Sequence, residues 1–139
     1  MITGINHITL AVADLARSVA FYRDVLRFKL ASQHHGGAYF RAGGCWLCLS
    51  LDARAAEQSR SDYTHLAFDI AASDFDDFAA TLVSAGVPIW KENSSEGASV
   101  YFADPDGHKL ELHVGTLDSR LQALAARSCS SARGPECSA

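Results

Sequence analysis

The feature that most constrains this fold is an internal repeat. The run NHITLAV at residues 6–12 is echoed by THLAFDI at residues 64–70, and each run has β-type composition with a histidine in second place. Each is followed by apolar residues at helical spacing, over residues 14–26 and 73–85. Asp14 and Ser73 are the expected N-caps of these helices, and Gly86 is the expected end of the second helix.

Three short strands are predicted after each helix. The first set covers residues 29–32, 38–41 and 45–51, and the second covers 88–92, 99–103 and 109–114. Each half is therefore expected to be a βαβββ module of about 55 residues, a size at which a lone module is only marginally stable. The chain is predicted to be an α+β protein, with curved mixed sheets that pair within one chain or across two.

The expected boundaries follow from these patterns. The N-terminal module covers residues 1–51, a polar linker covers 52–62, and the C-terminal module covers 63–115. Residues 116–127 are predicted to form a final helix. Residues 128–139 are rich in serine and small residues and are predicted to be disordered.

Charge and hydropathy exclude several kinds of partner. The formal net charge is −4 and the pI is about 5.8, so the overall field does not attract nucleic acid or anionic membranes. No apolar run approaches the roughly 20 residues needed to span a bilayer. The first residues lack the basic region and apolar core of a signal peptide, so a cytoplasmic location is expected.

The repeat places three candidate metal ligands in matching positions. Superimposing the two halves puts His7 opposite His65, and puts Glu111 opposite Cys48 in the last strands. Two imidazoles and one carboxylate that converge on a shared cleft form a facial site suited to Mn²⁺, Fe²⁺, Co²⁺ or Zn²⁺. Taken singly, each residue is better explained by a structural or solvent-facing role, and only the symmetry favours a site.

Other polar residues surround this expected centre. Thr9 lies on the same strand face as His7, where its hydroxyl can reach a metal-bound substrate or can simply favour the strand. The loop over residues 91–101 is rich in hydroxyl, amide and glycine residues, which suits an anion, a monovalent cation or a solvated hairpin. Arg120 offers a further positive charge or is an exposed helix residue.

Several motifs resemble one known family. The NHITLAVADL start is similar to the vicinal-oxygen-chelate superfamily, which includes glyoxalase I and the extradiol dioxygenases. The stretches WLCLS (46–50), DYTH (62–65), SEGAS (95–99) and DPDGHKLELHVG (104–115) resemble the FosA-type fosfomycin resistance proteins within it. The likeness covers roughly residues 1–125.

The resemblance implies an activity and roles for individual residues. Members of that family are homodimeric and add glutathione to the epoxide of fosfomycin, using Mn²⁺ and K⁺. Metal ligands are then implied at His7, His65 and Glu111, with Thr9 beside the epoxide oxygen. The other implied sites are the phosphonate site (Lys91, Ser95, Tyr101, Arg120), the substrate cavity (Tyr39, Trp46) and the potassium loop (Asn93, Ser95, Glu96, Gly97, Ser99).

The resemblance also implies how two chains and a thiol meet. Modules would pair across the homodimer, so that each metal takes His7 from one subunit and His65 and Glu111 from the other. The thiol site is expected around His34, Gly36, Ser50 and Ser94. Two alternatives stay open: a transferase that uses cysteine or bacillithiol, and a non-catalytic protein of the same fold that binds a small molecule or antibiotic.

Overall fold

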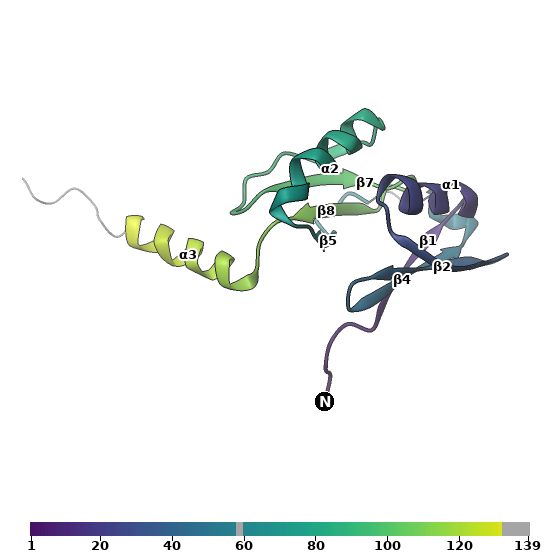
Figure 1. The fold of residues 1–139 in the computed structure, drawn as a ribbon, viewed down its shortest axis with the longest axis horizontal. Coiled ribbons are helices and arrows are strands. Elements are labelled where there is room, and N and C mark those ends of the chain that lie inside the picture. Colours follow the sequence, from purple (N-terminus) through teal and green to yellow (C-terminus); the bar gives the residue numbers. More distant parts are fainter. Residues whose placement is uncertain (58–59, 132–139) are drawn as a thin grey trace, which may run out of the picture.

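The computed structural model describes residues 1–57 and 60–131. These residues form eight strands, which belong with their helices to two βαβββ units (Figure 1). The first unit contains β1 (His7–Val12), α1 (Leu15–Ala20), η1 (Phe21–Val25), β2 (Lys29–His34), β3 (Gly37–Ala42) and β4 (Cys45–Leu51). After η2 (Ala53–Glu57), the second contains β5 (Leu66–Asp69), α2 (Ala72–Ser84), β6 (Ile89–Lys91), β7 (Ser99–Ala103) and β8 (Lys109–His113), and α3 (Leu117–Ser131) follows.

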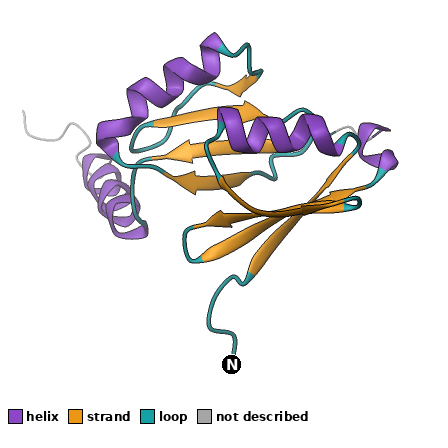
Figure 2. Cartoon of the chain, turned by 45° about the vertical axis from the view of Figure 1, so that its right-hand side comes forward, coloured by secondary structure: helices purple, strands orange, loops and turns teal. Residues whose placement is uncertain are grey.

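The two sheets have the same topology, which confirms the repeat. Their strand orders are β1-β4-β3-β2 and β5-β8-β7-β6. Each sheet has a parallel pair at one edge, which is β1 with β4 in the first sheet and β5 with β8 in the second. Thr9 pairs with Cys48 in the first sheet, and Ala67 pairs with Glu111 in the second. Thr9 and Ala67 each lie two residues after a repeat histidine, so Glu111 and Cys48 are equivalent, as the superposition predicted. Figure 2 shows the two sheets as separate layers.

The first predicted helix is divided into two parts. Asp14 caps α1 as expected, with its carboxylate accepting from the amide of Arg17 at 3.0 Å. From Phe21 the backbone widens into a π-helical turn, in which Leu26 N donates to Phe21 O at 3.0 Å. This turn points Tyr22 and Phe21 into the core, where both are buried.

Several expected boundaries are corrected. The second repeat strand begins at Leu66, so His65 lies just before it. The N-cap of α2 is Ala71 instead of Ser73, whose hydroxyl donates to Asp74. Gly86 lies just past the helix end with φ of +69°, a conformation that glycine adopts without a Cβ clash, as expected for a stop.

The last helix is longer than predicted. It runs from Leu117 to Ser131, so residues 128–131 are helical and not part of a disordered tail. Alanine and leucine up to residue 126 favour a helix whose last turn then carries through the serines. Residues 132–139 lie outside the described residues. The expected linker is also partly ordered, because η2 is a 3₁₀ turn.

A buried polar cluster joins the two units. Asp106, in the turn between β7 and β8, accepts from Ala13 N, Ser18 Oγ and Arg17 NH2 of the first unit at 3.0–3.1 Å. Asp104 accepts from Tyr22 Oη at 2.9 Å and from the Nδ1 of His108 at 2.8 Å. The DPDG turn at residues 104–107 therefore also anchors α1 and η1 to the second sheet.

The helices differ in how they contact this body. α1 packs on the first sheet, and one continuous apolar core includes residues of both units. The helix α3 projects away from the body, with Leu117, Leu121 and Leu124 exposed (Figure 1). Within residues 1–57 and 60–131, no helix combines the length and apolar character that crossing a membrane requires.

Candidate metal centre

Two of the three predicted ligands meet in the second sheet. The Nε2 of His65 lies 3.0 Å from Oε2 of Glu111. Its Nδ1 lies 2.9 Å from the carbonyl oxygen of Tyr63. A carbonyl only accepts, so Nδ1 carries a proton and Nε2 is the nitrogen presented beside the carboxylate. Histidine ligands are commonly oriented in this way by a second hydrogen bond.

Glu111 is an unusual residue for a strand interior. It is 5% exposed and faces Tyr101, its cross-strand partner. A carboxylate is rarely buried unless it is paired or binds a cation. Oε2 faces His65, while Oε1 accepts from Ser99 Oγ at 2.6 Å. A buried carboxylate beside an imidazole nitrogen fits one half of a divalent metal site.

The third predicted ligand lies in the first sheet. His7 begins β1 and is exposed, and its ring stacks on Trp46 with centroids 4.2 Å apart and an interplanar angle of 19°. Its Nδ1 lies 2.7 Å from Oδ1 of Asn6, an acceptor, which leaves Nε2 free. Thr9 is exposed on the same face, so the predicted pair stands side by side on β1.

One chain does not bring the three ligands together. Among the described residues, no three histidine, cysteine, aspartate or glutamate side chains are grouped closely enough to hold a metal. The chain therefore carries two half-sites: His7 with Thr9 on the first sheet, and His65 with Glu111 on the second. A mononuclear site that uses all three is therefore not formed within the described part of one chain.

The predicted phosphonate residues cluster beside the second half-site. Lys91 Nζ lies 4.3 Å from the centroid of the Tyr101 ring and donates to Ser94 Oγ at 3.4 Å. The hydroxyls of Ser95 and Tyr101 are 3.3 Å apart. The ammonium of Lys91 on β6, the hydroxyl of Tyr101 on β7 and the hydroxyl of Ser95 in the loop between them form a cradle with the donors that a phosphonate requires.

Arg120 reaches the same region from α3. Its Nε lies 3.7 Å from Oε2 of Glu96, and that oxygen is buried without a hydrogen-bond partner. A buried oxygen of this kind is normally satisfied by a donor or a cation. Glu96 is therefore placed to bind either the guanidinium or a cation in the loop.

The predicted potassium loop is closed by Asn93. The Nδ2 of Asn93 donates to Gly97 O at 2.9 Å, and its Oδ1 accepts from both the amide and the hydroxyl of Ser95 at 3.0 Å. Gly97 has φ of +79°, and a Cβ there would lie 2.3 Å from the carbonyl oxygen of Val114. Ser99 differs from the rest, because its hydroxyl is engaged with Glu111 and His113.

The predicted cavity residues and three of the four predicted thiol residues lie in the first unit. Tyr39 meets Trp46 edge-on at 5.3 Å and His34 at 5.7 Å, and a cavity of about 410 Å³ is lined by Tyr39 and Trp46. The Nδ1 of His34 accepts from Gly36 N at 3.2 Å. Ser50 lies on β4 beside this hairpin, whereas Ser94 lies in the other unit next to Lys91. The four expected thiol residues are therefore divided between the two units, with Ser94 alone in the second.

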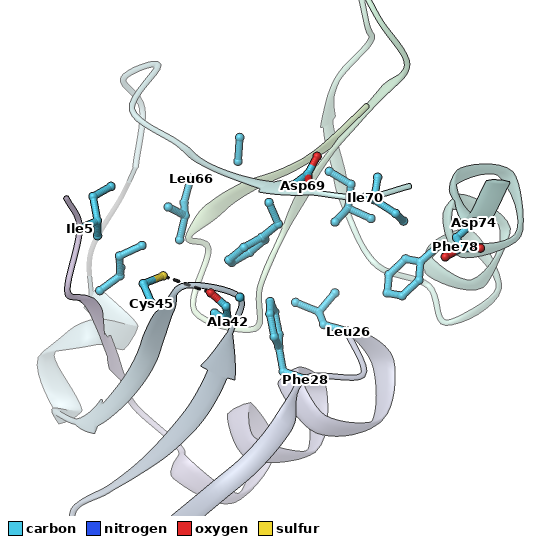
Figure 3. Close-up of a pocket in the computed structure, with 15 residues that line it drawn as sticks. Ile5, Leu26, Phe28, Ala42, Cys45, Leu66, Asp69, Ile70, Asp74 and Phe78 are labelled. Carbon is cyan, nitrogen blue, oxygen red and sulfur yellow. Dashed lines mark hydrogen bonds between the residues drawn. The ribbon is translucent and has the colours of Figure 1, made fainter. Parts of the chain in front are cut away.

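A second cavity lies between the two units, and none of the predicted site residues lines it. It measures about 540 Å³ and is lined mainly by apolar side chains, among them Phe28, Leu66 and Phe78 (Figure 3). Asp69 and Asp74 are its acidic members. None of the predicted ligands or phosphonate residues lines it, so it is not the candidate centre.

Sequence reasoning missed several residues around the second half-site. Tyr63 and Trp90, together with Tyr101 of the predicted phosphonate site, surround the His65 ring at centroid distances of 5.0–5.9 Å. His113 contacts Ser99 at 2.7 Å. Its position two residues after Glu111, on the same strand face, was the available signal.

Comparison with known proteins identifies the family of the chain. Residues 4–112 match the model of the Glyoxalase/Bleomycin resistance protein/Dioxygenase superfamily. This chain belongs to that superfamily. It is 51% identical over 125 residues to the glutathione transferase FosA of Serratia marcescens, spanning 88% of this chain and 89% of the relative. It is 42% identical to the metallothiol transferase FosB of Staphylococcus epidermidis, spanning 87% and 90%.

Solved structures place the chain in the same branch of the superfamily. The fosfomycin resistance protein FosX of Listeria monocytogenes superimposes with a TM-score of 0.75 at 34% identity, covering 86% of this chain and 99% of FosX. A mutant of that FosX was solved with Mn(II) and 1S,2S-dihydroxypropylphosphonic acid, at a TM-score of 0.74 and 32% identity, covering 87% and 99%. Within the superfamily, the chain belongs with the fosfomycin resistance proteins.

Proposed function

We propose that this protein inactivates fosfomycin by adding the thiol of glutathione to its epoxide. The observation that carries the proposal is the 51% identity to a glutathione transferase FosA over nearly the whole length of both chains. The buried Glu111 carboxylate beside His65 supports it, because a carboxylate and an imidazole 3.0 Å apart fit one half of a divalent metal site. The protein is thus an enzyme of the transferase class.

We further propose that the cofactor is Mn²⁺, bound by His7, His65 and Glu111. The oxygen and nitrogen donors suit it, and related FosX was solved with Mn(II). A divalent ion in this place supplies Lewis-acid stabilisation of the charge that develops on the epoxide oxygen. Because one chain holds only half-sites, the functional unit is proposed to be a homodimer in which each centre draws on both chains.

The chain's own residues orient the substrate. Lys91, Ser95 and Tyr101 donate to the phosphonate. Arg120 leaves its contact with Glu96 and donates to the phosphonate as well. Holding the phosphonate fixes the epoxide carbon for attack from the side opposite its oxygen. The thiolate sulfur forms the C–S bond, the C–O bond breaks, and the freed oxygen takes up a proton beside Thr9.

The loop closed by Asn93 is proposed to hold K⁺ near the phosphonate. Backbone carbonyls and the Glu96 carboxylate are hard oxygen donors, and one oxygen of Glu96 lacks a hydrogen-bond partner. The role of K⁺ would be to offset the negative charge of the phosphonate, together with Lys91. Activity measured in K⁺ and in choline salts at one ionic strength tests this role, since an equal rate in both would remove K⁺ from the proposal.

Mass detection of the thiol–fosfomycin adduct tests the reaction itself. We expect an adduct with glutathione that requires Mn²⁺ and disappears in Glu111→Ala, because the carboxylate is a metal ligand. Parallel reactions with cysteine and bacillithiol separate the alternative thiols. Protection of fosfomycin-treated cells without any adduct would instead indicate a binding protein, and a Glu111→Ala rate equal to wild type would remove Glu111 from the centre.

A further inference from the structure

His113 stands behind the candidate metal ligand Glu111. It is the last residue of β8, and its Nδ1 lies 2.7 Å from Ser99 Oγ. Ser99 Oγ lies 2.6 Å from Oε1 of Glu111. The direct distance from His113 Nδ1 to Oε1 is longer, at 3.6 Å. The imidazole therefore reaches the carboxylate through the serine hydroxyl.

The hydrogens in this chain of contacts have one arrangement. An ionised carboxylate only accepts, so the single proton of the Ser99 hydroxyl points to Glu111. The serine oxygen must then accept, which makes Nδ1 of His113 the donor. Hydrogen bonds to a carboxylate are short and strong, in keeping with 2.6 Å. Oε1 is thereby held, and Oε2 is left facing His65.

The imidazole lies in a slot between two glycines. A Cβ on Gly97 would lie 3.0 Å from Cε1 of His113, and a Cβ on Gly115 would lie 2.6 Å from Nε2. Any larger residue at either position would displace the ring. The side chain of His113 is 18% exposed, against 7% for Glu111, so most of the imidazole is shielded from solvent.

We propose that His113 is a positioning residue that, through Ser99, fixes the carboxylate of Glu111 for metal binding. This inference rests on the proposed function, because it assumes that Glu111 is a metal ligand. It also gives Ser99 a second role beside the loop, since the same hydroxyl connects the loop over residues 93–99 to the metal ligand. Partners of this kind change metal affinity by about 10–100-fold when they are removed.

Mn²⁺ binding to the full-length protein without substrate tests the inference. Free Mn²⁺ is measured by electron paramagnetic resonance while Mn²⁺ is titrated into wild type, His113→Leu, His113→Asn and Ser99→Ala. We expect the dissociation constant to rise about 10–100-fold in His113→Leu and in Ser99→Ala. His113→Asn should stay within about threefold of wild type, because its amide nitrogen replaces the Nδ1 donor. His35→Leu, which changes an exposed hairpin histidine, is the matched control.

The double variant decides whether the two residues act as one unit. The double variant Ser99→Ala with His113→Leu should bind Mn²⁺ no more weakly than either single variant, because both substitutions break the same connection to Glu111. Losses that multiply would overturn the proposal, as would unchanged affinity in a folded His113→Leu protein. Thermal melting without metal identifies folded variants, and Ser99→Ala with Ser99→Thr as its hydroxyl-bearing control carries the test if His113→Leu does not fold.

The outcome is separable from that of the proposed reaction. Wild-type protein that binds Mn²⁺ in the expected His113-dependent way but forms no fosfomycin adduct would overturn the reaction and leave the positioning role standing. Adduct formation with equal Mn²⁺ affinity in wild type and His113→Leu would do the reverse.

Discussion

At the scale of single residues, each predicted histidine ligand is held by neighbours on its own sheet. Asn6 and Trp46 hold the His7 ring. The carbonyl of Tyr63 and three surrounding aromatic side chains hold His65. Both rings turn Nδ1 toward an acceptor, which leaves both Nε2 atoms for a metal. This matching arrangement follows the repeat, although the neighbours that create it differ between the two halves.

The stack between His7 and Trp46 gives one prediction at this scale. Trp46→Leu should weaken Mn²⁺ binding by up to about tenfold, because the His7 ring loses one face and gains rotamer freedom. Trp46→Phe keeps an aromatic face and should bind nearly as wild type. Isothermal titration of Mn²⁺ without fosfomycin isolates this effect from the expected role of Trp46 in the substrate cavity. Equal affinity in Trp46→Leu would mean that the stack does not orient His7.

At the scale of elements, the loop between β6 and β7 is the segment whose shape matters most to the centre. Gly97 gives it a left-handed turn against the carbonyl of Val114, and Ser99 begins β7 next to Glu111. The sequence pattern identified this stretch as a polar loop with a glycine. It did not reveal that the loop closes against the end of β8.

Gly97→Ala should damage the protein more than a matched glycine substitution. Both Gly97 and Gly43 have positive φ, which costs an alanine about 1–2 kcal/mol. Only at Gly97 would the new Cβ meet backbone, 2.3 Å from Val114 O, whereas nothing lies within 4 Å at Gly43. Thermal and urea unfolding should therefore show Gly97→Ala to be about 1–3 kcal/mol less stable than Gly43→Ala. Equal losses would show that the loop moves aside freely.

At the scale of the whole molecule, buried polar residues hold the two units together. Burial most strongly raises the pKa of Tyr22 well above 10.0, and the charge of Asp104 and the hydrogen bond to it add to this. Burial alone would raise the pKa of Asp104, but hydrogen bonds from His108 and Tyr22 outweigh it and leave that pKa below 3.8. The pair is thus kept as phenol and carboxylate across the pH range between these values.

This pair predicts how stability depends on pH. Because the pKa of Tyr22 is raised in the folded state, its contribution is present below about pH 10 and is lost as pH rises further. Tyr22→Phe should cost about 1–3 kcal/mol at neutral pH, since Asp104 loses a donor. Urea unfolding between pH 8 and 11 should show a smaller alkaline loss in Tyr22→Phe than in wild type. Parallel curves would mean that Tyr22 does not titrate with unfolding.

The depressed pKa of Asp104 gives the acid limb of the same profile. Its contribution is present above pH 3.8 and is lost as pH falls through the lower, folded-state pKa. In Asp104→Asn, the free energy of unfolding measured with urea should depend less on pH below pH 4. Asp52→Asn is a suitable comparison, because the hydrogen bond from Arg54 also lowers the pKa of Asp52 but this pair lies on the surface. An unchanged acid limb in Asp104→Asn would contradict this assignment.

A centre shared between chains makes a stronger prediction. Neither His7→Ala nor Glu111→Ala should form the fosfomycin adduct alone, because each lacks a ligand in every site. Mixed by co-refolding, they should recover about a quarter of wild-type sites, since half the dimers pair both variants and each such dimer has one intact site. A mixture as inactive as its parts would place the three ligands within one chain.

The sequence by itself determined the repeat, the strand arrangement and the candidate ligands. Strands Cys45–Leu51 and Ser99–Ala103 have the predicted bounds, and Glu111 occupies the position equivalent to Cys48. Period-two alternation, turn residues and repeated histidines are local signals, so they can be read without knowing any contact. Family likeness then added the substrate, which no local pattern contains.

Only the tertiary structure decided what lies around those ligands. The π-helical turn that buries Tyr22, the connection from His113 through Ser99 to Glu111, and the separation of His7 from His65 all depend on contacts between distant segments. Side-chain direction and the angle between sheets come from packing, which the spacing of residues along the chain does not encode. The candidate metal ligands, and through the family resemblance their division into His7 on one side and His65 with Glu111 on the other, were therefore predictable, while the residues that support each half-site were not.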